Sequence, residues 1–313
     1  MYYFEVAPNQ IIRAGSDTFT YASSVRLSVG HVVVIEVGKK QLIGIVMNEV
    51  TKPRYDTKQI VATIEELPLP IPLVHLSSWL AIYYKTPLAT VLQTILPRGL
   101  QKSRRAQISQ PRISSRDRTK IVFTNDQVAA LEKIESMSPG SAILHGVTGS
   151  GKTHVYIELV KRALSRGESA IILVPEIALT SQLVDEFSHH FGDILLTHSR
   201  QTEAQRHLTW KEALESEVPR VVIGPRSALF LPLKKVGIIV IDEAHEPAYK
   251  QEQAPRYSAL RAASILASAH HAKVILGSAT PLVAVITLPC HKVDLLLSCR
   301  HPPEKIPSNQ LLP

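Results

Sequence analysis

The segment Gly146-Val147-Thr148-Gly149-Ser150-Gly151-Lys152-Thr153 fits the pattern G-x-x-x-x-G-K-[S/T] in full. It follows the apolar run 142–145 and is placed to open a helix, which is the context that this pattern requires. Glycines allow backbone N–H groups to turn inward around phosphates, and the start of the following helix adds partial positive charge. The segment therefore predicts an ATP site on a phosphate-binding loop.

The side chains of this loop suit different tasks. We expect the Lys152 ammonium to reach the β- and γ-phosphates of ATP, and the Thr153 hydroxyl to ligate Mg²⁺. The loop residues predicted to bind ATP are Gly146, Thr148, Gly149, Ser150, Gly151, Lys152 and Thr153.

A second apolar run, 236–241, ends in Asp242-Glu243-Ala244-His245. Acids delivered by an apolar strand beside a phosphate-binding loop are typical of the second half of such a site. We expect Asp242 to hold Mg²⁺ through water, and Glu243 to polarise the attacking water as a general base. The predicted catalytic residues are thus Lys152, Asp242 and Glu243, and the alternative is an acidic strand end without a special role.

The segment Gly277-Ser278-Ala279-Thr280-Pro281 follows another apolar run. Small hydroxyl residues at the end of a strand can relay hydrogen bonds between an ATP site and a nucleic acid. A plain turn explains these five residues equally well.

Apolar runs alternate with helical stretches from residue 121 onward. The expected strands are 142–145, 170–174, 194–196, 221–223, 236–241 and 274–276, and the expected helices include 178–191 and 258–269. Most of these runs are continuous, which is typical of parallel strands covered by helices on both faces. We therefore predict an α/β fold with a doubly wound parallel sheet over 121–290, followed by an irregular tail over 291–313.

The first hundred residues have a different pattern. Short β-type runs at 2–6, 19–21, 32–37 and 42–46 are separated by turn residues, and an apolar helix is expected near 73–84. This predicts a small β-rich domain over 1–100, built as an open barrel or a sandwich. Residues 101–120 are rich in Arg, Ser and Gln and are predicted to be a linker.

Positive charge is concentrated in the N-terminal third. The net charge is +8, with 16 Lys and Arg against 8 Asp and Glu in residues 1–120, and 19 of each beyond. The densest part contains Arg98, Lys102, Arg104, Arg105, Arg112, Arg116, Arg118 and Lys120. Such a basic stripe suits the phosphates of nucleic acid, and the alternative is a solvated linker.

Composition excludes several classes of protein. The two cysteines, Cys290 and Cys299, have no partners at metal-ligand spacing, so neither a disulfide scaffold nor a zinc site is expected. No signal peptide and no apolar stretch of about 20 residues is visible. We expect a cytoplasmic protein without membrane contact.

The order of these motifs resembles the first RecA-like lobe of superfamily 2 helicases. Further segments at 174–180, 197–199, 223–230, 249–251 and 255–257 closely resemble the primosomal protein N′ family, the replication-restart DNA helicases of bacteria. The likeness covers about residues 121–285. It implies a P-loop RecA-like fold and an ATP-dependent 3′→5′ helicase of primosome assembly that binds forked DNA. It also implies contact with other primosome proteins and single-strand-binding protein.

The resemblance also implies roles for matched positions. Gln127 lies where the family reads adenine, with a helix-surface glutamine as the alternative. Arg226 falls in a segment that touches DNA. Arg256 and Tyr257 belong to a loop that couples DNA binding to ATP hydrolysis, where Tyr257 either stacks on a base or packs in the core.

The first domain resembles the family's pocket for the 3′ end of a nascent strand. Phe19, Thr20 and Gly38 lie at the matching positions. Family members often carry Asp where Thr20 stands, and a carboxylate is a better acceptor for a 3′-hydroxyl than a neutral hydroxyl. We therefore expect general DNA affinity, with 3′-end recognition left open.

Two departures from the family pattern bear on activity. The 101–120 linker stands where the family has a winged-helix domain, and the sequence contains no second lobe, arginine finger or cysteine-rich zinc insertion. Loss of such an arginine is worth roughly 10³–10⁵ in rate, so the chain alone is expected to hydrolyse ATP slowly. The alternative is a DNA-binding and loading module with a nucleotide pocket but no motor. A third hypothesis, a small-molecule kinase, is disfavoured because the acidic box and the basic stripe would have no role in it.

Overall fold

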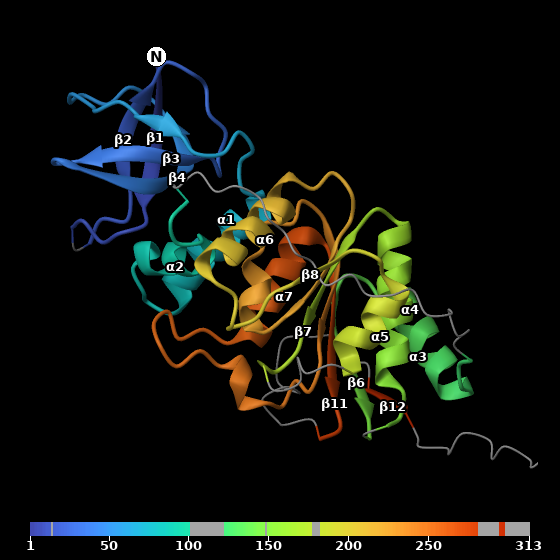
Figure 1. The fold of residues 1–313 in the computed structure, drawn as a ribbon. Coiled ribbons are helices and arrows are strands. Elements are labelled where there is room, and N and C mark those ends of the chain that lie inside the picture. Colours follow the sequence, from blue (N-terminus) through green and yellow to red (C-terminus); the bar gives the residue numbers. More distant parts are fainter. Residues whose placement is uncertain (14, 101–121, 148, 177–181, 281–293, 298–313) are drawn as a thin grey trace, which may run out of the picture.

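The computed structural model describes residues 1–13, 15–100, 122–147, 149–176, 182–280 and 294–297. The linker 101–120, with Arg104 and Arg105, lies outside the described residues. So do Thr148, Cys290 and Cys299. Figure 1 shows a small β-rich part at the N-terminus above a larger part in which helices flank a central sheet.

Five strands of the N-terminal part form one antiparallel sheet. They are β1 (Tyr2–Pro8), β2 (Phe19–Ser23), β3 (Val32–Val37), β4 (Lys40–Val50) and β5 (Ala62–Thr63), in the order β2-β1-β4-β3-β5. The backbone N–H of Ala22 donates to the Lys58 carbonyl, and the N–H of Ile60 donates to the Ala22 carbonyl. The segment before β5 therefore reaches the opposite edge of the sheet, which curls it toward the open barrel predicted from the sequence.

Two helices connect this sheet to the larger part. The first, α1 (Ile71–Tyr83), lies where a helix was predicted, and a second, α2 (Leu88–Ile95), follows Pro87. Buried residues of both helices share one hydrophobic cluster with α7 (Ala259–His270) of the larger part. An ion pair of 3.3 Å between Lys211 and the buried Glu65 also joins the two parts.

The larger part is built on a seven-stranded parallel sheet. Its strands are β6 (Gly140–Gly146), β7 (Ser169–Leu173), β8 (Ile194–Leu196), β9 (Val221–Gly224), β10 (Val236–Ile241), β11 (Lys273–Ser278) and β12 (Asp294–Leu297). Their order is β12-β6-β11-β10-β7-β9-β8, and every neighbouring pair is parallel. The predicted fold class is confirmed. The prediction of an irregular tail over 291–313 is wrong for the four residues of β12, which pair with β6.

Helices cover both faces of this sheet, as Figure 1 shows. One face carries α3 (Asn125–Ser136), α4 (Lys152–Ser165) and α5 (Gln182–His190), and the other carries α6 (Glu203–Glu215) and α7. Short 3-10 helices η2 (Arg226–Phe230) and η3 (Pro247–Tyr249) follow β9 and β10. None of the helices in the described part of the chain is long and apolar enough to cross a membrane.

Successive residues of each central strand belong to different cores. In β10, Ile239 and Ile241 pack in the cluster that contains α7, whereas Ile238 and Val240 pack in the cluster that contains α4. Side chains of a strand alternate between its faces, so a sheet covered on both sides needs apolar residues at every position. This is the physical reason for the unbroken apolar runs. Because β6 and β10 run in the same direction, the phosphate-binding loop and the acidic box that follow them lie at the same edge of the sheet.

Acid pH is expected to destabilise this fold through His270 at the end of α7. Burial lowers the pKa of His270 to about 4, and its Nδ1 lies 3.4 Å from the backbone N of Val236. The unfolded chain takes up this proton near pH 6.5, so stability falls between pH 6.5 and 4 and is unaffected above that window. At about 1.4 kcal/mol per pKa unit the loss approaches roughly 3 kcal/mol.

Urea unfolding at pH 7, 5.5 and 4.5 measures this effect. The His270→Gln variant should lose less stability than the wild type between pH 6.5 and 4, because glutamine takes up no proton. His75→Gln, which changes an exposed histidine of α1, should behave as the wild type. Parallel pH profiles for the wild type and His270→Gln would contradict the assignment.

Candidate functional site

The phosphate-binding loop joins the end of β6 to the start of α4. Gly149 and Gly151 have φ angles of 81° and 79°, in the left-handed region that favours glycine. A Cβ on Gly151 would lie 2.3 Å from Nε2 of Gln127. Position 151 therefore favours glycine through its φ angle, and a larger residue would also have to displace the end of the Gln127 side chain.

Lys152 is buried at the first position of α4. Its Nζ donates to the carbonyl oxygen of Gly146 over 2.7 Å and lies 4.0 Å from Oε1 of Glu243. The ammonium thus lies between the phosphate-binding loop and the acidic box. The structure brings the three predicted catalytic residues to one place, at the carboxyl edge of the sheet.

Asp242 and Glu243 immediately follow β10, between β7 and β11. The Asp242 carboxylate accepts a hydrogen bond of 3.1 Å from the hydroxyl of Tyr156 on α4. Burial is the main cause that raises the pKa of Asp242, and the negative charge of Glu243 adds to it. The hydrogen bond from Tyr156 and the Lys152 ammonium act in the opposite direction. Glu243 has a φ of 46°, in the left-handed region, so the backbone turns sharply directly after Asp242.

His245 connects the acidic box to the end of β11. Its Nδ1 lies 3.0 Å from Oγ of Ser278 and 3.4 Å from Oε2 of Glu243. The same Ser278 hydroxyl accepts from the backbone N–H of Thr280 over 3.1 Å. The segment after β11 is therefore hydrogen-bonded to the acidic box rather than being a separate turn.

Gln127 lies in the first turn of α3 and is only 4% exposed. Its side chain completes a capping box with Thr124, in which Oε1 accepts from the Thr124 N–H over 3.0 Å. Its Nε2 donates to the carbonyl oxygen of Ser150 over 3.0 Å. The helix-surface alternative is therefore wrong. Both ends of the amide are thus held, one by the cap and one by the phosphate-binding loop.

The donor set here fits Mg²⁺ bound together with a nucleotide. Thr153 offers an oxygen ligand and Asp242 a carboxylate for water on the ion, and Mg²⁺ is usually held by protein oxygens together with substrate phosphates and water. Oγ of Ser150 in the loop is buried without a hydrogen-bond partner among the described residues. Nowhere in those residues do three or more His, Cys, Asp or Glu side chains form a group that could hold a metal ion.

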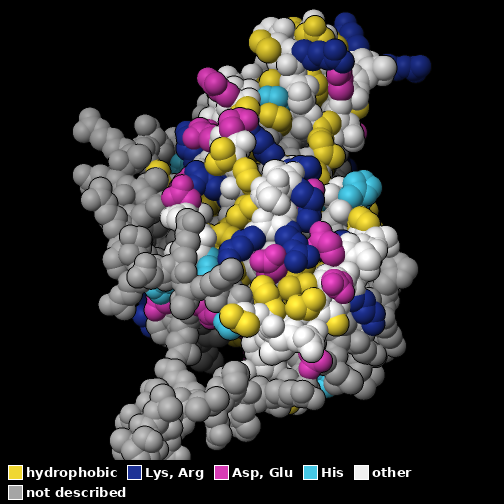
Figure 2. All heavy atoms as spheres, turned by 90° about the vertical axis from the view of Figure 1, so that its right-hand side faces the viewer, with side chains coloured by type: hydrophobic (Ala, Val, Ile, Leu, Met, Phe, Trp, Pro, Cys, Tyr) yellow, Lys and Arg dark blue, Asp and Glu magenta, His cyan; other side chains and the backbone are white. Residues whose placement is uncertain are grey.

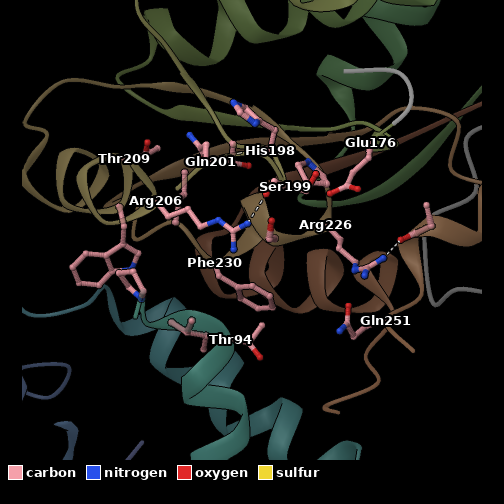
Figure 3. Close-up of a pocket in the computed structure, with 18 of the residues that line it drawn as sticks. Thr94, Glu176, His198, Ser199, Gln201, Arg206, Thr209, Arg226, Phe230 and Gln251 are labelled. Carbon is pink, nitrogen blue, oxygen red and sulfur yellow. Dashed lines mark hydrogen bonds between the residues drawn. The ribbon is translucent and has the colours of Figure 1, made fainter. Parts of the chain in front are cut away.

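A cavity of about 900 Å³ lies beside the acidic box, between α2 and the sheet-based part. Figure 3 shows Thr94 of α2 on one side, and His198, Ser199 and Arg206 on the other. Glu243 and Tyr249 also line it. Arg226 also lines it and donates to the Ala248 carbonyl over 2.5 Å. The predicted DNA-contacting residue Arg226 therefore opens onto the same cavity as the predicted general base.

Tyr257 is a core residue in this structure. It is 1% exposed, and its ring packs edge-on against Phe230 at 5.2 Å between centroids. The prediction that Tyr257 stacks on a base is wrong for this structure, because the ring is buried. The alternative, that Tyr257 packs in the core, agrees with its burial. Its neighbour Arg256 is exposed, with a φ of 49°.

The loop from Lys250 to Tyr257 contacts the N-terminal part. The Lys250 ammonium lies 5.2 Å from the centre of the Tyr84 ring, at the end of α1. The hydroxyl oxygen of Tyr84 accepts from the backbone N–H of Ser258 over 3.0 Å. These two contacts join the end of α1 to the chain that follows the acidic box.

Thr20 and Gly38 of the first sheet each have one neighbour, from the segment 55–58, that the motifs had not singled out. The hydroxyl of Tyr55 donates to Oγ1 of Thr20 over 2.9 Å. Lys58 donates to the Gly38 carbonyl over 3.0 Å and pairs with Glu36. Phe19, next to Thr20, is half-buried. This part of the surface offers a cation, two hydroxyls and an aromatic ring, which suit the end of a nucleic-acid strand.

The face that carries α3 and α4 has charges of both signs. Figure 2 shows Lys and Arg side chains mixed with Asp and Glu side chains on this side of the molecule. Arg162 and Arg166 pair with Glu135, and Lys235 pairs with Glu168. The positive charge of these side chains is thus balanced by nearby acids.

Comparison with known proteins identifies both parts of the chain. Residues 124–287 match the model of the DEAD/DEAH box helicase family, and residues 11–97 match that of a 3'DNA-binding domain (3'BD). The replication restart protein PriA of Bacillus subtilis is 37% identical over 221 residues, covering 68% of this chain and 27% of that protein. PriA of Helicobacter pylori strain 26695 is 34% identical over 288 residues, covering 90% and 43%.

The chain spans less than half the length of these curated relatives. Among solved structures, a DEAD box protein from Methanococcus jannaschii is 20% identical, with a TM-score of 0.43. The likeness covers 56% of this chain and 50% of that one.

Proposed function

The chain belongs to the DEAD/DEAH box helicase family, and we propose that it supplies the DNA-binding domain and first motor lobe of an ATP-driven replication-restart helicase. Its likeness to primosomal protein N′, or PriA, is confirmed over both of its parts. The observation that carries the proposal is the meeting of Lys152, Asp242 and Glu243 at one edge of the parallel sheet, beside the cavity lined by Arg226.

In this proposal ATP is held by the phosphate-binding loop. Backbone N–H groups of the loop and the start of α4 face the phosphates, and Lys152 neutralises their charge. Thr153 and Asp242 would hold Mg²⁺, which neutralises charge that develops on the phosphates during transfer. Glu243, 4.0 Å from the Lys152 ammonium, takes the proton of the attacking water.

DNA binding is assigned to both parts of the chain. Phe19, Thr20 and Gly38, with Tyr55 and Lys58 beside them, would hold the end of a strand at a fork. The residues proposed to contact the DNA backbone are Arg104, Arg105, Arg226 and Arg256. Further partners in the proposal are other primosome proteins and single-strand-binding protein. The direction of movement is proposed to be 3′→5′.

The Glu243→Gln variant tests the chemistry of this proposal. Glutamine keeps the size of the side chain but cannot accept the proton, so single-turnover hydrolysis should fall by at least about 100-fold. The Kd of a fluorescent ATP analogue should stay within about twofold of the wild type. The assay uses radiolabelled ATP, excess protein and forked DNA. The wild-type trace also gives the slow basal rate of hydrolysis expected of the chain alone.

Glu132→Gln, an exposed carboxylate on α3, is the matched control and should keep the wild-type rate. Equal hydrolysis by Glu243→Gln and the wild type would rule out Glu243 as the base. Tight binding of ATP and DNA by the wild type with no hydrolysis would instead favour a loading module without motor activity.

A further inference from the structure

Tyr156 is a fully buried tyrosine on α4, four residues after Lys152. Helical residues four apart lie on the same side of a helix, so Tyr156 faces the sheet one turn beyond the phosphate-binding loop. Its hydroxyl donates to Oδ1 of Asp242 over 3.1 Å. A residue that no motif singled out is therefore in direct contact with the carboxylate proposed to hold Mg²⁺.

Gly277 at the end of β11 leaves the space that this contact needs. A Cβ at position 277 would lie 1.6 Å from the Tyr156 hydroxyl oxygen and 3.4 Å from Oδ1 of Asp242. The carbonyl oxygen of Gly277 also accepts from the backbone N–H of Ala244 over 2.8 Å. Three elements, α4, β10 and β11, thus meet around one hydroxyl–carboxylate hydrogen bond.

Resting on the proposed function, we propose that Tyr156 is a positioning residue that fixes the Asp242 carboxylate for Mg²⁺ bound with ATP. An ionised carboxylate has two oxygens and about four acceptor sites. The bond from Tyr156 takes one of these and restrains rotation of the side chain, and the remaining sites are left for water on the ion. Outer-shell partners of metal ligands are typically worth 10–100-fold in metal affinity.

Tyr249 provides a matched control on the same aspartate. It is also buried, and its hydroxyl lies 2.6 Å from the main-chain carbonyl oxygen of Asp242 and 3.0 Å from that of Leu173. Tyr249→Phe removes the same chemical group as Tyr156→Phe, but from the backbone of Asp242 rather than from its carboxylate. A purely structural role predicts the same behaviour for both variants.

The experiment compares nucleotide affinity with and without Mg²⁺. The Kd of a fluorescent ATP analogue is measured with excess Mg²⁺ and with EDTA for the full chain, and the ratio of the two values reports the contribution of the ion. Tyr156→Phe should lower this ratio by about 10-fold, with the EDTA value unchanged within about twofold. Tyr249→Phe should keep the wild-type ratio, even though both variants lose thermal stability.

A second variant perturbs the same contact from the other side. Gly277→Ala places a methyl group where the Tyr156 hydroxyl lies, so it should also lower the ratio. In an Asp242→Asn background, Tyr156→Phe should have little further effect, because the two residues then act through one contact. A wild-type ratio in folded Tyr156→Phe or Gly277→Ala would overturn the proposal. Failure of the wild type to bind nucleotide would overturn the proposed function itself.

Discussion

Replacing Lys152 by alanine is expected to raise the Kd for Mg·ATP by about 10- to 100-fold. Charge-assisted hydrogen bonds contribute about 1.5–3 kcal/mol, and each 1.4 kcal/mol is tenfold in affinity. The substitution also leaves Glu243 beside the phosphates without the cation that lies 4.0 Å from it. Titration of the fluorescent analogue at saturating Mg²⁺ measures the change directly.

Lys161→Ala removes an equal charge from the same helix, nine residues beyond the loop. It should leave the Kd unchanged within about twofold, because its side chain is too far along α4 to reach the phosphates. Circular dichroism establishes that both variants are folded. If folded Lys152→Ala binds Mg·ATP as tightly as the wild type, the nucleotide site is not where the motifs place it.

Much of the α/β part could be predicted from local sequence because its signals are local. An apolar run, a glycine-rich loop and the start of a helix follow each other without a gap at 142–153. Parallel strands also end at one edge of a sheet, so two motifs that each follow an apolar run must lie at the same edge. This rule places Lys152 and Glu243 at one edge, and their proximity also requires that only β11 separates β6 from β10 in the sheet.

Helices with weak apolar signals were harder to predict. The buried face of α6 consists of His207, Trp210, Ala213 and Leu214, and the rest of the helix is polar. In the structure Thr202 and Gln205 form a capping box at its start. The short α2 directly follows Pro87. Because proline in a sequence indicates a turn more strongly than the start of a helix, this helix was not predicted.

Side chains that meet only through tertiary packing gave no sequence signal. Tyr156 and Asp242 are 86 residues apart, and Tyr84 and Ser258 are 174 apart. Tyr257 shows the opposite error, because an aromatic residue in a polar loop resembles a stacking platform until its partner Phe230 is known. The role of Gln127 in reading adenine stays a prediction, and its burial against Ser150 depends on how α3 packs.

DNA affinity is expected to depend steeply on salt, mainly through the basic segment that begins at Arg98. The net charge of +8 resides entirely in residues 1–120, and Arg162, Arg166 and Lys235 of the larger part are paired with acids. If roughly five basic residues neutralise phosphates, the log–log slope for duplex DNA is about −4 to −5. Affinity should then fall roughly 250- to 1,000-fold between 50 and 200 mM salt.

Replacing Arg104, Arg105, Arg112 and Arg116 by serine should reduce the magnitude of that slope by about 3 to 4 units. The variant neutralises four fewer phosphates, so fewer counterions are released from the DNA on binding. A matched variant changes Arg162, Arg166, Lys234 and Lys235 to serine; all four are ion-paired in the structure. It removes the same charge but should shift the slope by less than about one unit.

Fluorescence anisotropy with forked and blunt duplexes across a salt series measures both slopes and any preference for a free 3′ end. Equal slopes for the two variants would mean that the basic segment is only a solvated linker. DNA affinity must then come from the first sheet, near Thr20 and Lys58, or from the cavity at Arg226.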